Sequence, residues 1–443
     1  MIRLKWSSIA WVGLYVFVVI VPLVGGAIHL EHGRGFWLNF SIALGFLSLS
    51  MLGAQFVIAS RMEFVSSPIG MDVVLAFHRA MAYPATAFAL VHPLLLFALD
   101  VRYLQLLNVF SSPLRAKFAV LSAVALVALV LLSIFRRRWR IRYKVWQISH
   151  WLLALTVLMA AMAHVLLVNY YLKDPWQRLT WQMLTLLFVG LGLWVRVLKP
   201  LLRYRRRWRV AQITAHADGT VSLELELVNK ASYGPKGFAF KAGQFAWITA
   251  RNSPFSFSYN PFSISSSALV TDRIGFTIKG HEGFSAEVAH LQLGDVLYVD
   301  GPYGGFFLDE EQCAPLVLIG AGVGVTPLVS MLETLADQRS ARPCHLWLAS
   351  KNEDSIVCQA QIERLQKRLS LEVLHVFSSP LHTANRQGAR LDPAFILRHL
   401  PAQAHAASYF VCGPMALMEM AQQSLLQAGV PAHHIHHERF GIV

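Results

Sequence analysis

The chain has 443 residues, of which 55% are hydrophobic and 14% charged, and it carries a formal net charge of +14. This composition is too apolar for an ordinary soluble protein of this length and predicts that part of the chain lies in a membrane. The positive charge does not indicate nucleic-acid binding, because the basic residues stand in short bursts between apolar runs, at 136–144 and 199–209. The four cysteines show no CxxC spacing, which favours reduced thiols in a cytosolic domain over disulfides.

The first half of the chain contains six apolar runs, each long enough to span a membrane as a helix. The first run is too long for a signal peptide and is followed by no small-residue cleavage site, so we interpret it as a span. Lysine and arginine are concentrated at the N-terminus and in alternate connecting segments, which predicts that both ends of this domain lie in the cytoplasm. The expected spans are residues 8–30, 36–59, 72–99, 116–135, 146–169 and 179–198.

The third and fifth spans each carry two histidines fourteen residues apart, His78 with His92 and His150 with His164. On an α-helix this spacing is a rise of about 21 Å with a return to nearly the same face. An imidazole in lipid is costly without a partner, and two such helices offer facing pairs at two depths. A single intramembrane histidine more often only hydrogen-bonds a neighbouring helix, but two matched pairs favour metal ligation. The pattern predicts two b-type haems, the inner one between His78 and His150 and the outer one between His92 and His164.

From residue 210 the pattern changes to short alternating strands with glycine and proline turns, which predict a small β-barrel of about 100 residues. After Cys313, apolar strands alternate with amphipathic helices, as in an α/β nucleotide-binding domain. We therefore expect a multi-domain membrane protein with three parts. They are an all-α six-helix transmembrane bundle at 1–203, a β-barrel at 204–311 and an α/β domain at 312–443.

A glycine-rich segment, Gly320-Ala321-Gly322-Val323-Gly324-Val325-Thr326-Pro327, follows the first apolar strand of the α/β part. Thr326 can cap a helix there, and Pro327 suits the first helical turn. The glycines would let a diphosphate approach free N–H groups at the positive end of the helix. With a strand before it and a helix after it, the segment favours a nucleotide site over a plain tight turn.

Short motifs of the second half occur in an order that resembles the ferredoxin–NADP reductase family of flavoproteins. Joined to six spans with paired histidines, the chain resembles the ferric reductase and NADPH oxidase superfamily over nearly its whole length. The resemblance implies that the barrel binds FAD and that the α/β domain binds NADPH or NADH. The motifs are AGQF at 242–245, NPFSIS at 260–265, IKGHEGFS at 278–285, GPYGG at 301–305, GAGVGVTP at 320–327 and CGP at 412–414.

The resemblance also implies roles for individual residues. Phe262 would lie against the flavin ring system and Ser263 near its reactive nitrogen, while Phe440 would stack on the flavin until the nicotinamide displaces it. Cys412 and Gly413 would face the nicotinamide, so Ser263, Cys412 and Phe440 are the expected catalytic residues. Taken singly, such aromatics and cysteines are also consistent with ordinary core packing. The other expected cofactor contacts are Asn260, Pro261, Ile264, Ser265, Lys279, Gly280, Gly283, Phe284, Ser285, Gly320, Gly322, Gly324, Thr326, Pro327, Ser350 and Lys351.

Two positions depart from the resemblance. Asn260 stands where oxidase-like members have histidine and soluble reductases have arginine, which puts its diphosphate contact in doubt. Leu96 stands where superoxide-producing eukaryotic members carry a further histidine, which puts oxygen as the acceptor in doubt. The nucleotide preference also stays open, because Ser350 and Lys351 favour NADPH whereas the acidic pair at 353–354 argues for NADH.

The expected function is electron transfer from cytosolic NAD(P)H through FAD and two haems to an acceptor outside the cytoplasm. A hydride delivers two electrons and a haem accepts one, so a flavin must stand between them. With histidine at both axial positions, the acceptor would be reduced at the haem edge. Oxygen, a ferric or cupric chelate, and a separate extracytoplasmic protein all remain open as acceptors. We expect a multi-pass protein of the plasma membrane, in bacteria the inner membrane, with the lipid bilayer and a small-molecule acceptor as partners.

Overall fold

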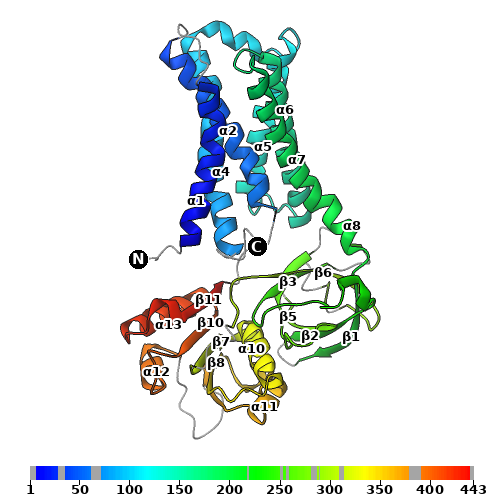
Figure 1. The fold of residues 1–443 in the computed structure, drawn as a ribbon, viewed down its shortest axis with the longest axis vertical. Helices are drawn as coiled ribbons and strands as arrows, with labels where there is room; N and C mark the ends of the chain where they lie inside the picture. The colour runs from blue at the N-terminus through cyan, green and yellow to red at the C-terminus, as the bar shows by residue number, and fades with distance from the viewer. Residues whose placement is uncertain are drawn as a thin grey trace. The chain divides into compact units, whose positions relative to one another are not determined.

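The computed structural model describes residues 6–27, 35–60, 71–216, 219–249, 253–255, 259–280, 287–288, 290–308, 314–378 and 391–439 (Figure 1). The chain divides into two compact units, Met1–Lys199 and Pro200–Val443. The first is a bundle of apolar helices, and the second combines an antiparallel sheet with a parallel α/β domain. This confirms the predicted fold class.

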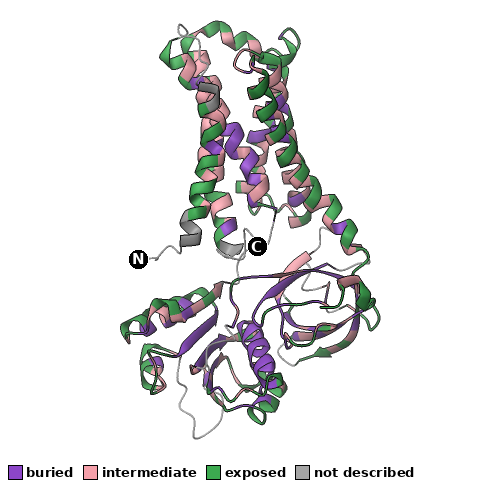
Figure 2. Ribbon diagram, in the orientation of Figure 1, coloured by how far each residue is buried: buried purple, intermediate pink, exposed green. Residues whose placement is uncertain are grey.

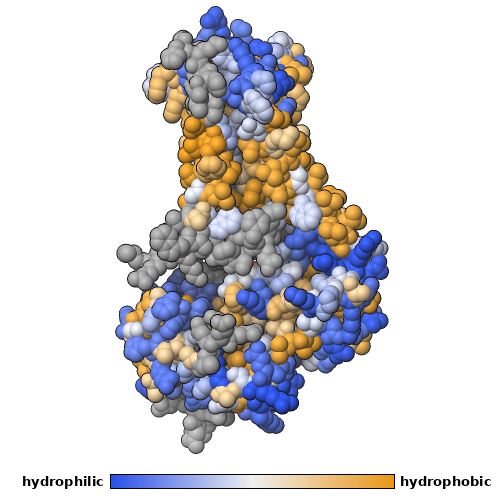
Figure 3. Space-filling view, in the orientation of Figure 1, coloured by the Kyte–Doolittle hydropathy of each residue, from blue (hydrophilic) through white to orange (hydrophobic). Residues whose placement is uncertain are grey.

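The first unit is built from long helices, five of which are long and apolar enough to cross a membrane. The described part of α1 contributes a shorter apolar stretch, Ala10–Val24, so the span expected at 8–30 stays a prediction. Hydrophobic side chains form a band along the middle of the visible face of these helices (Figure 3), which suits contact with lipid and not with water. The helices are α1 (Trp6–Ala27), α2 (Phe36–Ile58), α4 (Met71–Leu99), α5 (Leu114–Phe135), α6 (Tyr143–Val168) and α7 (Pro175–Leu193), with η1 (Val101–Leu107) after α4, and η2 (Trp194–Leu198) and α8 (Lys199–Arg203) after α7.

Small side chains let these helices approach closely. The main pairings are α2 with α4 and α5 with α6. Between α2 and α4, the Ser48 hydroxyl donates to the Ala85 carbonyl at 3.0 Å. Between α2 and α7, a Cβ on Gly53 would lie only 2.2 Å from the Phe188 ring. Such close contacts are how helices associate where lipid removes the hydrophobic driving force.

The first part of the second unit is a six-stranded antiparallel sheet in the order β4-β3-β6-β1-β2-β5. In β2, Leu223, Leu225 and Leu227 are buried while Glu224 and Glu226 are not, as period-two alternation requires. A bridge between Ile264 and Phe276 brings the end of β4 to β5 and so joins the two edges of the sheet. The strands are β1 (Arg207–Ala215), β2 (Thr220–Leu227), β3 (Phe245–Thr249), β4 (Tyr259–Ser263), β5 (Arg273–Lys279) and β6 (Val296–Tyr303).

The remainder is a five-stranded parallel sheet in the order β11-β10-β7-β8-β9. Its central strands and α10 hold the largest concentration of buried residues (Figure 2). One core cluster lies between the sheet and α10 and α11, and another between the sheet and α12 and α13. The strands are β7 (Leu316–Ala321), β8 (Cys344–Ser350), β9 (Leu371–Phe377), β10 (Ser408–Gly413) and β11 (Ile435–Arg439), and the helices are α10 (Val325–Asp337), α11 (Gln359–Gln366), α12 (Pro393–Arg398) and α13 (Met415–Gln427).

Two strands, β4 and β11, were not expected from the sequence. Each lies at an edge of its sheet. An edge strand needs less apolar surface than a central one and tolerates proline. The sequences YNPFS and IHHER therefore lack the apolar alternation by which the other strands are recognised.

Candidate functional site

The carboxyl ends of β7 and β10 form the centre of the predicted nucleotide site. From β7 the chain continues to β8 on one side, while β10 lies on the other side. In an open α/β sheet, ligands bind at such a topological switch point. The parallel register places Cys412 beside Gly320. A Cβ on Gly324 would lie 2.4 Å from the Cys412 carbonyl oxygen, so the glycine-rich turn and the end of β10 are in direct contact.

The start of α10 differs from the expectation in one respect. Gly324 is the N-cap residue, without a side-chain hydrogen bond, and the helix begins at Val325. Thr326 therefore lies inside the first turn, and the expectation that it caps the helix is wrong. Its hydroxyl is buried and has no partner among the described residues. Pro327 occupies the first turn as expected, where its missing N–H costs nothing. Gly324 supplies no side-chain cap, and the Val325 N–H donates to the Gly322 and Val323 carbonyls. The positive end of the α10 dipole lies at this turn, where it favours an anion.

The conformation of the turn explains two of its glycines. Gly322 has a φ of +53° with open space around its Cα, a backbone region that L-residues avoid. Gly324 has an ordinary φ of −62° but no room for a side chain. Gly322 is required by the shape of the turn, and Gly324 is required because β10 approaches it closely.

Ser350 and Lys351 lie at the same edge of the sheet. Ser350 ends β8, next to the glycine-rich turn that follows β7, and Lys351 is exposed just beyond it. The acidic pair at 353–354 belongs to the short helix η5 (Glu353–Ser355). The structure therefore brings these residues to the edge where the ribose of a bound nucleotide is read in this fold class.

The predicted flavin residues lie on β4 and directly after it. Asn260, Pro261 and Phe262 pair with β3, opposite residues 246–248, and Ser263 pairs with Phe245. Ile264 and Ser265 follow and are buried. The Ser263 hydroxyl is buried without a partner among the described residues. Leaving such a group unsatisfied costs about 1–3 kcal/mol, so this position fits a ligand with a polar atom.

Lys279 ends β5, and Gly280 follows it; both are exposed. These two residues are placed where a phosphate could reach them from solvent. The other expected contacts of this motif, Gly283, Phe284 and Ser285, lie outside the described residues, as does Phe440.

The antiparallel sheet and the nucleotide domain meet at Gly304. A Cβ there would lie 3.1 Å from Glu438 Oε1 and 3.1 Å from the Phe245 ring. Phe245 is the register partner of Ser263 on β4, and Glu438 is the register partner of Cys412 on β10. Ser263 and Cys412, proposed for the flavin and the nicotinamide respectively, therefore flank one junction.

The thiol at this junction is inert. Cys412 is fully buried, and its Sγ donates to the Glu438 carbonyl at 3.8 Å. Burial, with the nearby Glu438 carboxylate, raises the pKa of Cys412 well above its ordinary value. The group stays a thiol at neutral pH, so it is not a nucleophile.

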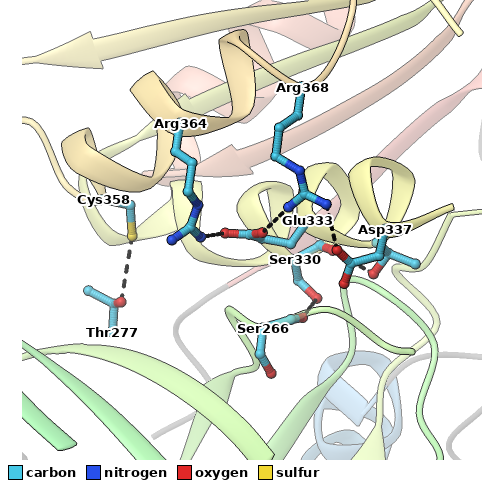
Figure 4. Close-up of polar contacts among 9 residues, drawn as sticks. Ser266, Thr277, Ser330, Glu333, Asp337, Cys358, Arg364 and Arg368 are labelled. Carbon is cyan, nitrogen blue, oxygen red and sulfur yellow. Dashed lines mark hydrogen bonds and ion pairs between the residues drawn. The ribbon is translucent and has the colours of Figure 1, made fainter. Parts of the chain in front are cut away.

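Hydrogen bonds fasten α10 to the segment that follows β4 (Figure 4). The Ser330 hydroxyl donates to the Ser266 carbonyl at 2.7 Å. One turn later, Thr334 Oγ1 accepts from the Ala268 N–H at 2.9 Å. The helix whose N-terminus faces the nucleotide site is thereby fixed against the flavin side. The contacts of Ser330 and Thr334 were not predicted from the sequence, although two hydroxyls four residues apart on an apolar helix face were a usable signal.

A second set of contacts ties α10 to α11 and α11 to β5 (Figure 4). The carboxylate of Glu333 is buried and forms ion pairs with Arg364 and, at 3.9 Å, with Arg368. The Cys358 thiol, which directly precedes α11, donates to Thr277 Oγ1 at 3.5 Å. These contacts hold the parallel α/β domain against the antiparallel sheet of the second unit.

Of the four histidines predicted to be haem ligands, two donate to backbone carbonyls. His92 Nδ1 lies 2.8 Å from the Ser41 carbonyl oxygen, and His164 Nδ1 lies 2.9 Å from the Arg115 carbonyl oxygen. A carbonyl oxygen only accepts, so Nδ1 carries the proton in both rings. This tautomer leaves Nε2 unprotonated, which is the state that a metal ligand requires.

The other two histidines lie close together. The ring centres of His78 and His150 are 6.4 Å apart. Two metal–nitrogen bonds are about 2 Å each, and each nitrogen is offset from its own ring centre, so this separation is compatible with one metal ion between the rings. His150 Nδ1 is 3.1 Å from the hydroxyl of Ser133, which itself donates to the Leu129 carbonyl and therefore accepts from the ring.

Two imidazoles hold a metal only where another group supplies the remaining ligands, as a macrocycle does. Within the described ranges, no group of three or more His, Cys, Asp or Glu side chains could hold a metal ion. The histidine pairs therefore do not form a protein-only metal site.

Comparisons with known proteins match both halves of the chain. Residues 44–161 match the family described as ferric reductase like transmembrane component, and residues 318–423 match the oxidoreductase NAD-binding domain. A flavohemoprotein of Bacillus cereus is 29% identical over 225 residues, covering 48% of this chain and 56% of that protein. The reductase component of propane 2-monooxygenase of Mycolicibacterium goodii is 28% identical over 244 residues, covering 53% of this chain and 67% of that protein.

The chain thus spans only 56% of the length of the flavohemoprotein that it matches. Among solved structures, the FAD/NAD-binding domain of a nitric oxide dioxygenase from Vibrio cholerae aligns with 53% of this chain and 98% of that chain, at 22% identity and a TM-score of 0.46. The match at residues 44–161 contains His78, His92 and His150. The match at residues 318–423 contains the glycine-rich turn and Cys412.

Proposed function

The chain joins a ferric reductase-like transmembrane domain to an FAD- and NAD-binding reductase unit, the architecture of the ferric reductase and NADPH oxidase superfamily, and on this basis we propose that it carries electrons across a membrane. Electrons would pass from NADPH or NADH to FAD, then to a b-type haem between His78 and His150. From there they would pass to a second haem between His92 and His164, and finally to an acceptor on the opposite side.

The orientation of the histidines supports the haem sites. The Ser41 and Arg115 carbonyls hold His92 and His164 in the ligand tautomer, and the spacing of His78 and His150 fits one metal. When bound, a haem with two histidine ligands supplies one-electron transfer without an open coordination position. The acceptor would therefore be reduced at the haem edge.

In the reductase unit, the protein residues bind and orient. The glycine-rich turn and the positive end of α10 would hold the nucleotide diphosphate. The Ser263 hydroxyl, which has no partner among the described residues, would hydrogen-bond the reactive nitrogen of the flavin, and Cys412 would pack against the nicotinamide. When bound, FAD accepts a hydride and passes the electrons on singly. The hydrogen bonds from α10 to Ser266 and Ala268 would fix the position of the nucleotide relative to the FAD.

The proposed acceptor is oxygen, giving superoxide or peroxide. Reduction of ferric or cupric chelates is the second candidate, and the family description matched by residues 44–161 favours it. A third candidate is a separate extracytoplasmic protein that receives the electrons; the relative from Mycolicibacterium is itself a reductase component.

The proposed location is the plasma membrane, in bacteria the inner membrane, with both ends of the chain in the cytoplasm. The basic segments at 136–144 and 199–209 support this orientation. Reporter fusions at the C-terminus and in the loop between α4 and α5 test it. A phosphatase reporter active at the C-terminus would contradict the proposed orientation.

One set of assays on detergent-purified protein separates the acceptors. With NADPH or NADH under air, cytochrome c reduction that superoxide dismutase abolishes selects oxygen. Reduction of a ferric chelate under argon selects the second candidate, and turnover only with a partner fraction selects the third. Bound flavin without low-spin cytochrome absorption, after expression with ample haem, would refute the electron path.

A further inference from the structure

The helices α2 and α4 pack in a regular register. The Ser41 hydroxyl donates to the His92 carbonyl at 2.7 Å. Seven residues along α2, the Ser48 hydroxyl donates to the carbonyl of Ala85, which precedes His92 by seven residues on α4. Seven residues are about two helical turns, so both contacts lie on one face of each antiparallel helix. The two contacts therefore define a seven-residue repeat, and this repeat can be continued along α2 and α4.

The next step of this repeat falls on Gln55 and His78. Gln55 is buried, with 8% of its surface exposed, yet both atoms of its side-chain amide lack a partner among the described residues. His78 Nδ1 is likewise buried and without a partner in that part of the chain. Unsatisfied polar groups are costly when buried, and no water is available in lipid to satisfy them.

His78 differs in this respect from the other three histidines. His92, His164 and His150 each have an oxygen within hydrogen-bond distance of Nδ1. A ligand histidine almost always donates its second nitrogen to such an oxygen, which sets the tautomer and raises the basicity of the ligand. The unmatched acceptor at the position opposite His78 is the amide oxygen of Gln55.

We propose that Gln55 is the positioning residue of His78, with its amide oxygen accepting the Nδ1–H of that ring. The inference rests on the proposed function, because ligation of a haem iron by Nε2 is what leaves the proton on Nδ1. With a haem bound, a hydrogen bond there would make the imidazole of His78 a stronger electron donor, would stabilise ferric over ferrous iron and would lower the reduction potential of that haem.

Three variants test the proposal by redox titration of the haem absorption and by low-temperature EPR of the full-length protein. Gln55→Met keeps the length of the side chain and removes the acceptor. Gln55→Glu supplies a stronger acceptor at the same place. Ser48→Ala is the matched control, because it removes one bond between the same helix faces and touches neither histidine. The component that belongs to His78 is identified as the one lost in His78→Ala.

We expect Gln55→Met to raise the potential of that component and Gln55→Glu to lower it, with haem affinity at the site falling by about 10–100-fold in Gln55→Met. Ser48→Ala should leave both components at their wild-type potentials. Wild-type potentials in both Gln55 variants, or shifts of the same sign, would overturn the role of Gln55. If the wild-type protein contains no haem in a haem-pyridine assay, or its haem shows no low-spin EPR signal of ligation by two histidines, the proposed function itself fails. This outcome is distinct from failure of the Gln55 role alone.

Discussion

The glycine-rich turn allows a sharp test, because two of its glycines are required for different reasons. In Gly324→Ala, the new methyl group would lie 2.4 Å from the carbonyl oxygen of Cys412, 2.7 Å from its carbonyl carbon and 2.9 Å from the Gly413 nitrogen. All three are backbone atoms, so no side-chain rotation relieves the contact. The substitution must move either the start of α10 or the end of β10.

The size of the movement follows from these distances. Carbon contacts are optimal at about 3.5–4.0 Å, so relief requires a displacement of about 1 Å. Overpacking of this kind costs about 1–3 kcal/mol. A misplacement of about 1 Å near the reacting groups can slow a reaction by about 10²-fold. The displaced residues here are those expected to hold the diphosphate and to face the nicotinamide.

Gly322→Ala is the matched control in the same turn. Its methyl group would meet open space, and only the positive φ of +53° opposes it, at a cost of about 1–2 kcal/mol. We expect Gly322→Ala to lower thermal stability while changing hydride transfer far less than Gly324→Ala does. The assay is anaerobic stopped-flow reduction of the bound flavin by NADPH and by NADH, at several nucleotide concentrations.

A Gly324→Ala protein that retains its flavin and is reduced at the wild-type rate would refute the reasoning. So would equal loss in the two variants, because it would show that strain in the turn, and not the approach of β10, determines the geometry. Flavin content measured on each preparation separates loss of hydride transfer from loss of the cofactor.

Four further outcomes are expected. His92→Ala should reduce the haem content from two per chain to one in a haem-pyridine assay, and an unchanged content would refute the ligand assignment. Gly45→Ala places a methyl group 3.3 Å from the His92 ring and should shift the EPR signal of that haem while keeping it bound; an unshifted signal would show that the ring does not depend on this contact. Burial acts to raise the pKa of the Asp337 carboxyl, but a hydrogen bond from Arg368 helps to hold that pKa below its ordinary value. The stabilisation is therefore present above the unfolded-state pKa and lost as pH falls through the folded-state pKa, so Asp337→Asn should remove roughly 0.2–1 kcal/mol at pH 7 and nothing at low pH, as measured by thermal unfolding. Cys412 should resist alkylation at pH 8 in the folded protein, because burial raises its pKa; rapid labelling found by peptide mass spectrometry would contradict the buried site.

The elements predicted correctly are those with a strong local pattern. The apolar runs became helices α2, α4, α5, α6 and α7, and the central strands β7, β8 and β10 were recognisable because buried parallel strands are continuously apolar. The edge strands β4 and β11 were missed because their sequences are polar, and their pairing depends on a neighbouring strand distant in sequence. The cap at Thr326 was predicted wrongly, because the N-cap residue is Gly324 and the helix begins at Val325, two residues earlier than a Thr326 cap implies.

By itself, the sequence determined which residues could act: paired histidines fourteen residues apart, a glycine-rich turn between a strand and a helix, and apolar runs of spanning length. These are properties of short segments, and helix and strand geometry alone converts them into faces and spacings. Only the tertiary structure decided what each group contacts. The acceptor of His92 lies 51 residues away and that of His164 lies 49 residues away, and the carbonyl that excludes a side chain at Gly324 belongs to Cys412 on another strand. Such contacts depend on how distant segments pack against each other, and no local pattern records that packing.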